Sequence, residues 1–175
     1  MIDPSRVVYR DATCADAPAL TRHWRDTFMA TFGHLYPPAD IEAYFAKHDE
    51  AQTVREIEDA SSRCRLALDA GRIIAAAKMG AYKLPVDPVG ARVRELHRLY
   101  VVEEAKGAGV AAALMDWTIA AALGEGADAL YLGVWRFNHR AQRFYRRYGF
   151  EIVGEYEFVV GDTRDPEFVM RKPLA

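Results

Sequence analysis

The sequence has 175 residues, which is enough for one domain with a single core and too few for two ordinary domains. Its hydrophobic fraction of 51% and charged fraction of 27% are typical of a folded globular domain and exclude a disordered chain. The 23 Lys and Arg residues are offset by 25 Asp and Glu residues, so the net charge of −2 excludes the basic excess of a nucleic-acid-binding protein. The two cysteines lack C-x-x-C spacing, and neither a leader pattern nor a membrane-spanning apolar run is visible, so we expect a cytoplasmic protein with no membrane partner.

The first part of the chain predicts a short strand followed by helices. Residues 7–10 are rich in β-forming side chains, and Asp16 then begins a helix that extends to Phe32. The apolar positions of this helix recur every four residues, at Leu20, Trp24, Phe28 and Phe32. Two consecutive prolines follow, and further helices are expected from Asp40 and over 53–60.

The rest of the chain alternates strands and helices. Residues 63–69 and 72–83 predict two strands joined by a tight turn at Ala70-Gly71. The later expected elements are a strand at 92–102, a helix from 110, a strand at 130–135, a helix at 138–148, and strands at 151–160 and 167–172. Because the strand–helix–strand order between 100 and 134 requires a parallel crossover, we expect a single α/β domain over 1–175 with a mixed, mostly antiparallel central sheet flanked by helices.

The strand at 92–102 carries two groups that can exchange protons, Glu95 and His97. Strict alternation places them on one face with Leu99 and Val101, and places Leu96, Arg98, Tyr100 and Val102 on the other. If the first face lines a cleft, either group can accept a proton directly or through water. The alternative for His97 is an ordinary packing role.

A loop of small residues leads from this strand into the next helix. Its sequence is Lys106-Gly107-Ala108-Gly109-Val110-Ala111. Backbone N–H groups without bulky neighbours and the positive end of a helix favour an anion such as a pyrophosphate, although a plain tight turn is the alternative. A P-loop is excluded because Lys106 precedes the glycines and no hydroxyl follows them, and a dinucleotide fingerprint would need an acid where Trp135 stands.

Two motifs carry a family resemblance. The loop at 106–111 resembles the Q/R-x-x-G-x-G/A signature of the GNAT acetyltransferases, although Lys106 departs from the usual Gln or Arg. Residues 138–151 are similar to the second signature of that family, N-x-x-A-x-x-F/L-Y-x-x-x-G-F. The resemblance implies the GNAT-like acyl-CoA N-acyltransferase fold, acetyl-CoA as cosubstrate and a primary amine as acceptor.

The same resemblance implies roles for individual residues. Tyr145 would protonate or bind the CoA sulfur, and Asn138 would cap its helix, contact the cofactor, or both. Glu95 is the expected base, with His97 or a water-mediated route as alternatives. Backbone groups of Val101 and Val102 would hold the pantetheine arm. The full cofactor-binding set implied is Tyr100, Val101, Val102, Lys106, Gly107, Ala108, Gly109, Val110, Ala111, Asn138 and Tyr145.

The acceptor and the partners are less specified by the sequence. Phe28, Tyr36 and the tail at 158–172 resemble the spermidine/spermine N-acetyltransferase-like branch, which implies a small amine or polyamine acceptor with Asp40, Glu42 and Tyr36 at its entrance. The alternatives are acetylation of a protein N-terminus or lysine, and a non-catalytic acyl-CoA-binding module; a homodimer is also an open alternative. The histidines and cysteines lack ligand spacing, so we expect no metal.

Overall fold

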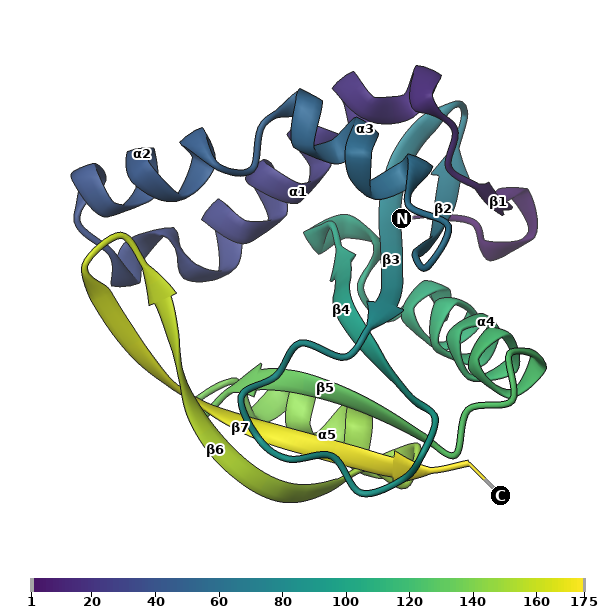
Figure 1. Cartoon of the computed structure of the whole chain (residues 1–175). Coiled ribbons are helices and arrows are strands. Elements are labelled where there is room, and N and C mark those ends of the chain that lie inside the picture. The colour runs from purple at the N-terminus through teal and green to yellow at the C-terminus, as the bar shows by residue number, and fades with distance from the viewer. Residues whose placement is uncertain (1, 175) are drawn as a thin grey trace.

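The computed structural model describes residues 2–174, which form one seven-stranded sheet with helices packed on it (Figure 1). The strand order is β1-β2-β3-β4-β5-β7-β6. The strands are β1 (Val8–Asp11), β2 (Arg63–Asp69), β3 (Arg72–Ala81), β4 (Val93–Val101), β5 (Ala129–Trp135), β6 (Glu151–Val160) and β7 (Thr163–Pro173). The α-helices are α1 (Ala17–Phe32), α2 (Pro38–Ala46), α3 (Glu50–Glu58), α4 (Val110–Gly124) and α5 (His139–Arg147). The predicted range 1–175 includes residues 1 and 175, which lie outside the described part.

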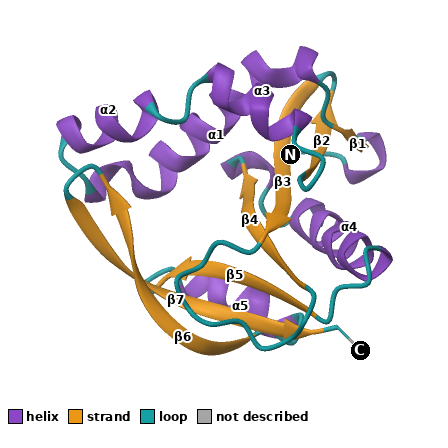
Figure 2. Cartoon of the chain, viewed as in Figure 1, coloured by secondary structure: helices purple, strands orange, loops and turns teal. Residues whose placement is uncertain are grey.

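The parallel strands β4 and β5 separate soon after they meet. Their pairing extends only from Val93 opposite Ala129 to Glu95 opposite Tyr131. The other neighbouring strands pair in antiparallel fashion, so the predicted mixed, mostly antiparallel sheet flanked by helices is confirmed (Figure 2). Beyond Glu95 the two central strands diverge, which opens the middle of the sheet.

Two apolar layers hold helices on opposite faces of the sheet. On one face, α1 packs Leu20 and Trp24 against Leu66 of β2, as the four-residue spacing predicts. On the other face, Leu114 and Met115 of α4 are buried in the largest core cluster. Each fully buried side chain of this size contributes about 1.5–3 kcal/mol. The two layers therefore fix the helices against the diverging strands.

The sequence predicts α3 and β7 too short at their N-terminal ends. The side chain of Asp49 accepts the N–H of Gln52 at 2.8 Å and starts α3 there. Val160 pairs directly with Thr163 across the predicted turn at Gly161, so β7 begins in the turn itself. Both elements begin with polar residues, and hydrophobic periodicity does not detect such N-terminal ends.

A β-bulge interrupts β4 beside the site where the central strands part. Lys78 of β3 lies opposite Arg98, whereas the next residue, Met79, lies opposite Leu96. His97 is therefore the extra residue on β4 and has no partner of its own on β3. A bulge of this kind reverses the alternation of side chains along the strand.

The predicted faces of β4 are wrong because of this bulge. Leu96 packs in the same core cluster as Leu99 and Val101, although strict alternation places it on the opposite face. Glu95 and His97 still share a side, and their carboxylate and imidazole lie 3.8 Å apart, from Oε2 to Nε2. The pair is thus turned away from the α4 layer and toward the face covered by α1.

Candidate active site

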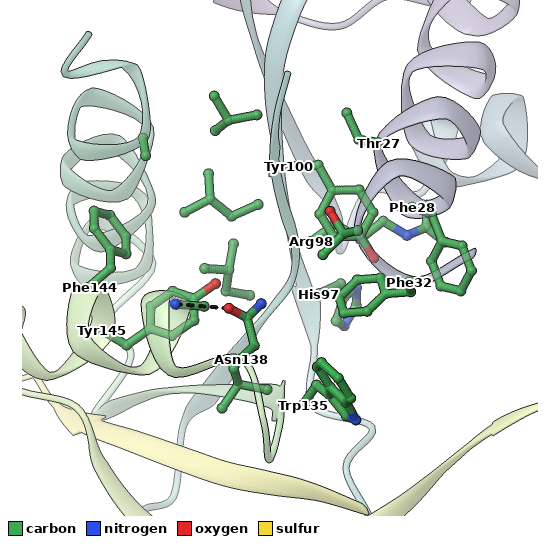
Figure 3. A pocket seen from close by; sticks show the side chains of 18 of the residues that line it. Thr27, Phe28, Phe32, His97, Arg98, Tyr100, Trp135, Asn138, Phe144 and Tyr145 are labelled. Atoms are coloured by element: carbon green, nitrogen blue, oxygen red, sulfur yellow. Dashed lines mark hydrogen bonds between the residues drawn. The ribbon is translucent and has the colours of Figure 1, made fainter. Parts of the chain in front are cut away.

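A cavity of about 810 Å³ lies where β4 and β5 separate (Figure 3). Its walls come from strands β3 to β7, the loop before α4 and the start of α4, and helices α1, α2, α3 and α5. Its volume is typical of a small-molecule site. It brings together the predicted residues Glu95, His97, Tyr100, Val101, Lys106, Gly107, Gly109, Ala111, Asn138 and Tyr145, whereas Val102, Ala108 and Val110 do not line it.

The loop before α4 has a backbone shape that is compatible with the anion site expected from the sequence. Gly107 and Gly109 have φ angles of +88° and +79°, which residues with a side chain rarely adopt, and no heavy atom lies within 4 Å of the place where a Cβ would stand. The first-turn N–H groups of Val110, Ala111 and Ala112 have no acceptor within their own helix. Together with the positive end of the helix dipole, these groups suit phosphate oxygens.

Two cations stand near this loop. Lys106 lines the cavity, and its ammonium forms an ion pair with Glu103. Arg140 also lines the cavity, and both cations lower the pKa of Glu103, with Lys106 as the stronger influence. Lys106 is therefore already paired within the chain, and a phosphate would have to compete with or join this exposed pair.

The backbone of β4 divides its hydrogen-bonding groups between β3 and the cavity. The N–H of Val102 donates to the carbonyl of Ile74 at 3.0 Å, so it is not available to the ligand that the sequence assigns to it. Because N–H groups alternate between the two edges of a strand, Tyr100 also faces β3, while Leu99 and Val101 face the separated β5. The unpaired edge of β4 is thus at Leu99 and Val101.

Asn138 and Tyr145 present polar groups from α5. Asn138 Oδ1 accepts the N–H of Ala141 at 3.1 Å, which confirms the predicted helix cap. The Tyr145 ring packs against Phe144 and Phe150, with ring centroids 5.5 and 5.9 Å away, and lies beside Asn138 in the cavity (Figure 3). Burial raises the pKa of Tyr145, so its hydroxyl keeps its proton at neutral pH and acts as a donor.

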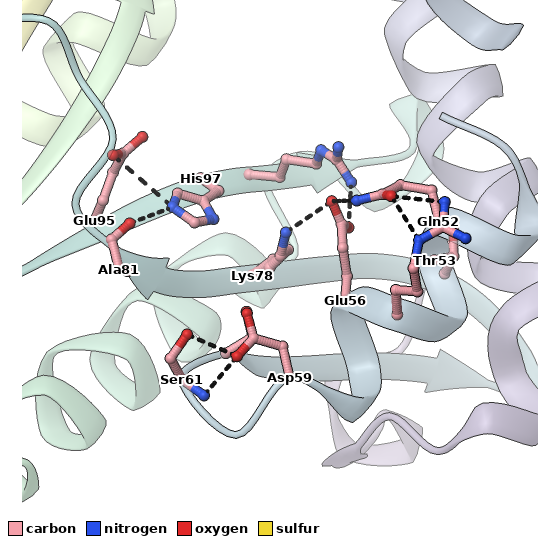
Figure 4. A network of polar contacts seen from close by, with 12 residues as sticks. Gln52, Thr53, Glu56, Asp59, Ser61, Lys78, Ala81, Glu95 and His97 are labelled. Atoms are coloured by element: carbon pink, nitrogen blue, oxygen red, sulfur yellow. Dashed lines mark hydrogen bonds and ion pairs between the residues drawn. The ribbon is translucent and has the colours of Figure 1, made fainter. Parts of the chain in front are cut away.

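Glu95 and His97 are held by backbone groups at the end of β3 and in the connection that follows it (Figure 4). Glu95 Oε2 accepts the backbone N–H of Lys83 at 2.7 Å, and His97 Nε2 donates to the carbonyl of Ala81 at 2.9 Å. Burial raises the pKa of Glu95 and lowers the pKa of His97 to about 4. The imidazole is therefore neutral at pH 7, with Nδ1 as its remaining acceptor.

A cluster of charged side chains that the sequence does not predict lies on the same side of the sheet. Lys78 Nζ is 2.9 Å from Glu56 Oε1, and Arg98 Nη1 is 3.1 Å from Glu56 Oε2 (Figure 4). All three residues line the cavity. Lys78 and Arg98 lie opposite each other on β3 and β4, and their like charges repel. The carboxylate of Glu56 on α3 offsets this repulsion. The acceptor side of the cavity is therefore not uniformly acidic.

Glu167 of β7 is the second group that the sequence did not mark. Its side chain lines the cavity, and Tyr156 donates a hydrogen bond to its Oε2 at 2.5 Å. The available signal was weak: Glu167 shares the period of the buried residue Val169 and so points to the same face of β7. A single acidic residue at the start of a predicted strand does not by itself indicate a functional site.

The expected amine entrance differs from the structure. Tyr36 lines the cavity, and its hydroxyl donates to Asp165. Asp40 instead accepts hydrogen bonds from the N–H groups of Asp162 and Thr163, so it anchors the β6–β7 turn to α2. Neither Asp40 nor Glu42 lines the cavity.

A family model described as the acetyltransferase (GNAT) family matches residues 18–150. The chain belongs to this family. An uncharacterised N-acetyltransferase of Lactobacillus delbrueckii subsp. lactis is 28% identical to this GNAT protein over 163 residues, which cover 91% of the chain and 92% of the relative. Uncharacterised N-acetyltransferases of Mycobacterium tuberculosis and Mycobacterium bovis are 42% identical over 80 residues, or 46% of the chain. The match spans 51% of the length of these mycobacterial relatives.

Solved structures show the same GNAT fold. The PaiA N-acetyltransferase of Thermoplasma acidophilum in complex with coenzyme A has a TM-score of 0.77 at 20% identity, with 95% of this chain and 98% of that chain covered. The ribosomal-protein-alanine N-acetyltransferase of Brucella melitensis has a TM-score of 0.72 at 23% identity, with 95% and 99% covered. These similarities establish the fold of the GNAT protein.

Metal-binding clusters and membrane-spanning helices are both absent from the described residues of the GNAT protein. Within residues 2–174, no three His, Cys, Asp or Glu side chains are grouped so that they could hold a metal ion. None of the helices in that range has the length and hydropathy required to span a bilayer.

Proposed function

We propose that this GNAT protein is an N-acetyltransferase that transfers the acetyl group of acetyl-CoA to the primary amine of a small molecule. The observation that carries the proposal is the meeting of an anion-binding loop, an unpaired strand edge and a protonated tyrosine in one cavity. The loop suits a pyrophosphate, the strand edge suits the amides of an extended arm, and the tyrosine suits a leaving thiolate. No single one of these features specifies the reaction, but their order along the cavity matches the parts of acetyl-CoA.

The edge of β4 would hold the pantetheine arm as an added strand. Leu99 and Val101 direct their backbone groups into the opening between β4 and β5, where the two strands have diverged. An N–H on this edge would also stabilise the negative charge that develops on the thioester oxygen during attack. Glycine-loop amides at Gly107 and Gly109 would surround the phosphates at the far end of the same ligand.

Tyr145 would act as the general acid. A thiol has an ordinary pKa of about 8.5, so the departing sulfur benefits from a proton donor at neutral pH. The Tyr145 hydroxyl is protonated at neutral pH, since a tyrosine has an ordinary pKa of about 10 and burial raises the pKa of Tyr145 further, so a proton is present when the C–S bond breaks. Asn138 at the start of the same helix would contact the arm through its amide nitrogen, since its oxygen is engaged in the helix cap.

The acceptor side of the cavity favours a compact amine. It is walled mainly by aromatic side chains, namely Phe28, Phe32, Tyr36, Tyr44, Tyr100, Trp135 and Phe158. Lys78 and Arg98 pair with Glu56 there, while Glu95 and Glu167 are two further carboxylates on the cavity wall. Because charges of both signs line this side, spermidine is the test of whether a polyamine is accepted.

We further propose that residues 1–175 act as one domain in the cytoplasm without a metal ion. The continuous sheet of residues 2–174 supports the single domain. A homodimer stays a prediction that size-exclusion chromatography with light scattering can check. Glu95 and His97, the two candidates for the base that the sequence indicates, both line the cavity.

Thiol release from acetyl-CoA tests the function. We expect turnover with at least one small amine from a panel that includes phenethylamine and spermidine. Turnover only with peptides that carry a free N-terminus or a lysine would indicate a protein acetyltransferase. Acetyl-CoA binding by calorimetry with no turnover of either class would indicate a non-catalytic acyl-CoA-binding module.

A further inference from the structure

Glu167 is a partly buried carboxylate on the cavity wall with no assigned role. It lies on β7 opposite Trp135 of β5 and opposite Tyr156 of β6. Glu167 lies two residues before Val169, which is opposite Gly133 and packs on the face of the sheet away from α4. The side chain of Glu167 therefore lies on that same face. This is the face on which the aromatic acceptor wall stands.

Gly133 leaves the space that the Glu167 side chain needs. A Cβ at Gly133 would lie 2.9 Å from Glu167 Oε2 and would also collide with the hydroxyl of Tyr156. Gly133 comes after Tyr131, the last residue of β5 that pairs with β4. The glycine therefore lets the carboxylate lie over β5 beside the opening between the two central strands.

Glu167 has a hydrogen-bond donor but no cation. Tyr156 donates to Oε2 at 2.5 Å, and no described residue donates to Oε1. Within residues 2–174, no Lys, Arg or His forms an ion pair with this carboxylate, whereas Glu56 has both Lys78 and Arg98. A carboxylate withdrawn from water is stabilised by a positive partner, and a protonated amine in the cavity would supply one.

The groups that face Glu167 come from every surrounding element. They are Tyr156 of β6, Asp165 of β7, Tyr36 after α1, Tyr44 of α2, Tyr100 of β4 and Tyr145 of α5, with Glu95 of β4 beyond Tyr156. Burial raises the pKa of Glu167 to about 7, the Tyr156 hydrogen bond lowers it, and Asp165 raises it. A base with this pKa can both accept and release a proton near neutral pH.

We propose that Glu167 binds the ammonium group of the acceptor and accepts its proton before the amine attacks acetyl-CoA. The inference rests on the proposed N-acetyltransferase function and assigns the protonated primary amine to a specific site. Tyr156 is a positioning residue in this scheme, because it fixes Oε2 and leaves Oε1 for the amine.

The proton balance of the step is complete without a further reactant. Glu167 takes one proton from the ammonium group, and the freed nitrogen pair forms the C–N bond at the thioester carbon. The C–S bond breaks with its electron pair on sulfur, which takes the proton of Tyr145. The tyrosinate regains a proton from the second N–H of the former ammonium, and Glu167 releases its own proton to solvent.

Glu95 is less suited to the same task. Its Oε2 is held by the N–H of Lys83, and Lys83 and Lys78 both act to lower its pKa against the effect of burial. Those cations also repel an incoming ammonium group. In addition, Glu167 and the proposed acid Tyr145 line the same cavity.

The pH profile of kcat/KM tests the inference in the whole protein, with phenethylamine as probe or the small amine from the panel that turns over best. We expect an inflection near pH 7 in the wild type, from the pKa of Glu167 of about 7. Glu167→Gln should lose this inflection and lower kcat/KM by about 100-fold, within the usual range for a proton-transfer group. The exposed control Glu157→Gln should retain it.

Two neighbours should move the inflection in opposite directions. Tyr156→Phe removes a hydrogen bond that lowers the pKa of Glu167, so the inflection should rise. Asp165→Asn removes a charge that raises that pKa, so the inflection should fall. A purely structural role for Glu167 would produce neither shift.

A binding measurement separates this inference from the proposed function. Calorimetry with phenethylamine and the CoA-bound protein needs no turnover, and Glu167→Gln should weaken amine binding at least fivefold while CoA affinity is unchanged. If the wild type turns over amines but Glu167→Gln keeps the inflection and kcat/KM within threefold, the inference is wrong. Unchanged amine binding in folded Glu167→Gln would overturn it even if the wild type shows no turnover.

Discussion

The two ends of the cavity are built in different ways. The end near α4 is made by neighbouring residues of one loop, where Gly107 and Gly109 give the backbone its shape and N–H groups supply the charge. The acceptor end gathers Glu56, Lys78 and Glu167 from three separate elements and depends on their side chains. A local backbone site can be recognised along the chain, whereas a site assembled across the sheet cannot.

The largest effect is expected from a change at the acceptor end of the cavity, which is assembled from separate elements. Glu56→Gln should lower the free energy of unfolding by about 3 kcal/mol at pH 7, because it leaves Lys78 and Arg98 facing each other without their shared carboxylate. Glu58→Gln, an exposed change on the same helix, is the matched control. Urea unfolding followed by circular dichroism measures both, and equal stabilities would show that the cluster does not support the acceptor wall.

The same variant has a pH dependence. Against the effect of burial, Arg98 and Lys78 hold the pKa of Glu56 below its usual value. The stabilisation is therefore complete above the unfolded pKa of about 4.3 and is lost as pH falls below it. The difference between the wild type and Glu56→Gln should shrink in acid.

A second stability effect comes from the bulge. Burial lowers the pKa of His97 to about 4, while the unfolded residue takes up a proton below about pH 6.5. Stability should therefore decrease as pH falls from 6.5 to 4, with about 3 kcal/mol due to this residue. His97→Gln should lose less stability over that interval than the wild type or the exposed control His34→Gln. Parallel pH curves would contradict a buried neutral imidazole.

The catalytic contrast between the two ends is expected at Tyr145. Tyr145→Phe should lower kcat by at least about tenfold, because the hydroxyl proton is needed only when the sulfur departs. The affinity for acetyl-CoA should change little, since the ring and its packing on Phe144 remain. Steady-state kinetics and calorimetry give the two numbers, and an unchanged kcat would remove Tyr145 from the mechanism.

The smallest effect is expected at the backbone end. Gly109→Ala forces a side chain into a φ of +79° at the start of α4, and this conformation costs about 1 kcal/mol. Acetyl-CoA affinity should fall about fivefold, while the pH profile of kcat should keep its shape. Gly124→Ala near the end of α4, where φ is not positive, is the control. If the pH profile of kcat changed instead, the two ends of the cavity would not act independently.

Much of the fold followed from local patterns. The stripe of Leu20, Trp24 and Phe28 predicted α1, and the turn at Ala70-Gly71 predicted the β2–β3 hairpin, because each signal lies within a few residues. The glycine loop and the cap at Asn138 were also recognised in this way, and the family match supports the fold they implied. The face assignment of β4 was wrong because period two assumes a regular strand, and the bulge at His97 breaks that period.

By itself, the sequence determined the order of strands and helices, the glycine loop and the place of Tyr145 on α5, since these depend on spacing between near neighbours. Only the tertiary structure decided that Val102 bonds to β3, that Asp40 anchors a turn, and that Glu167 lies over Gly133 beside the open strands. Those outcomes depend on register between segments far apart in the chain. Charge pairing and burial act through space, so they can be recognised only in the folded structure, where the sheet has brought the segments together.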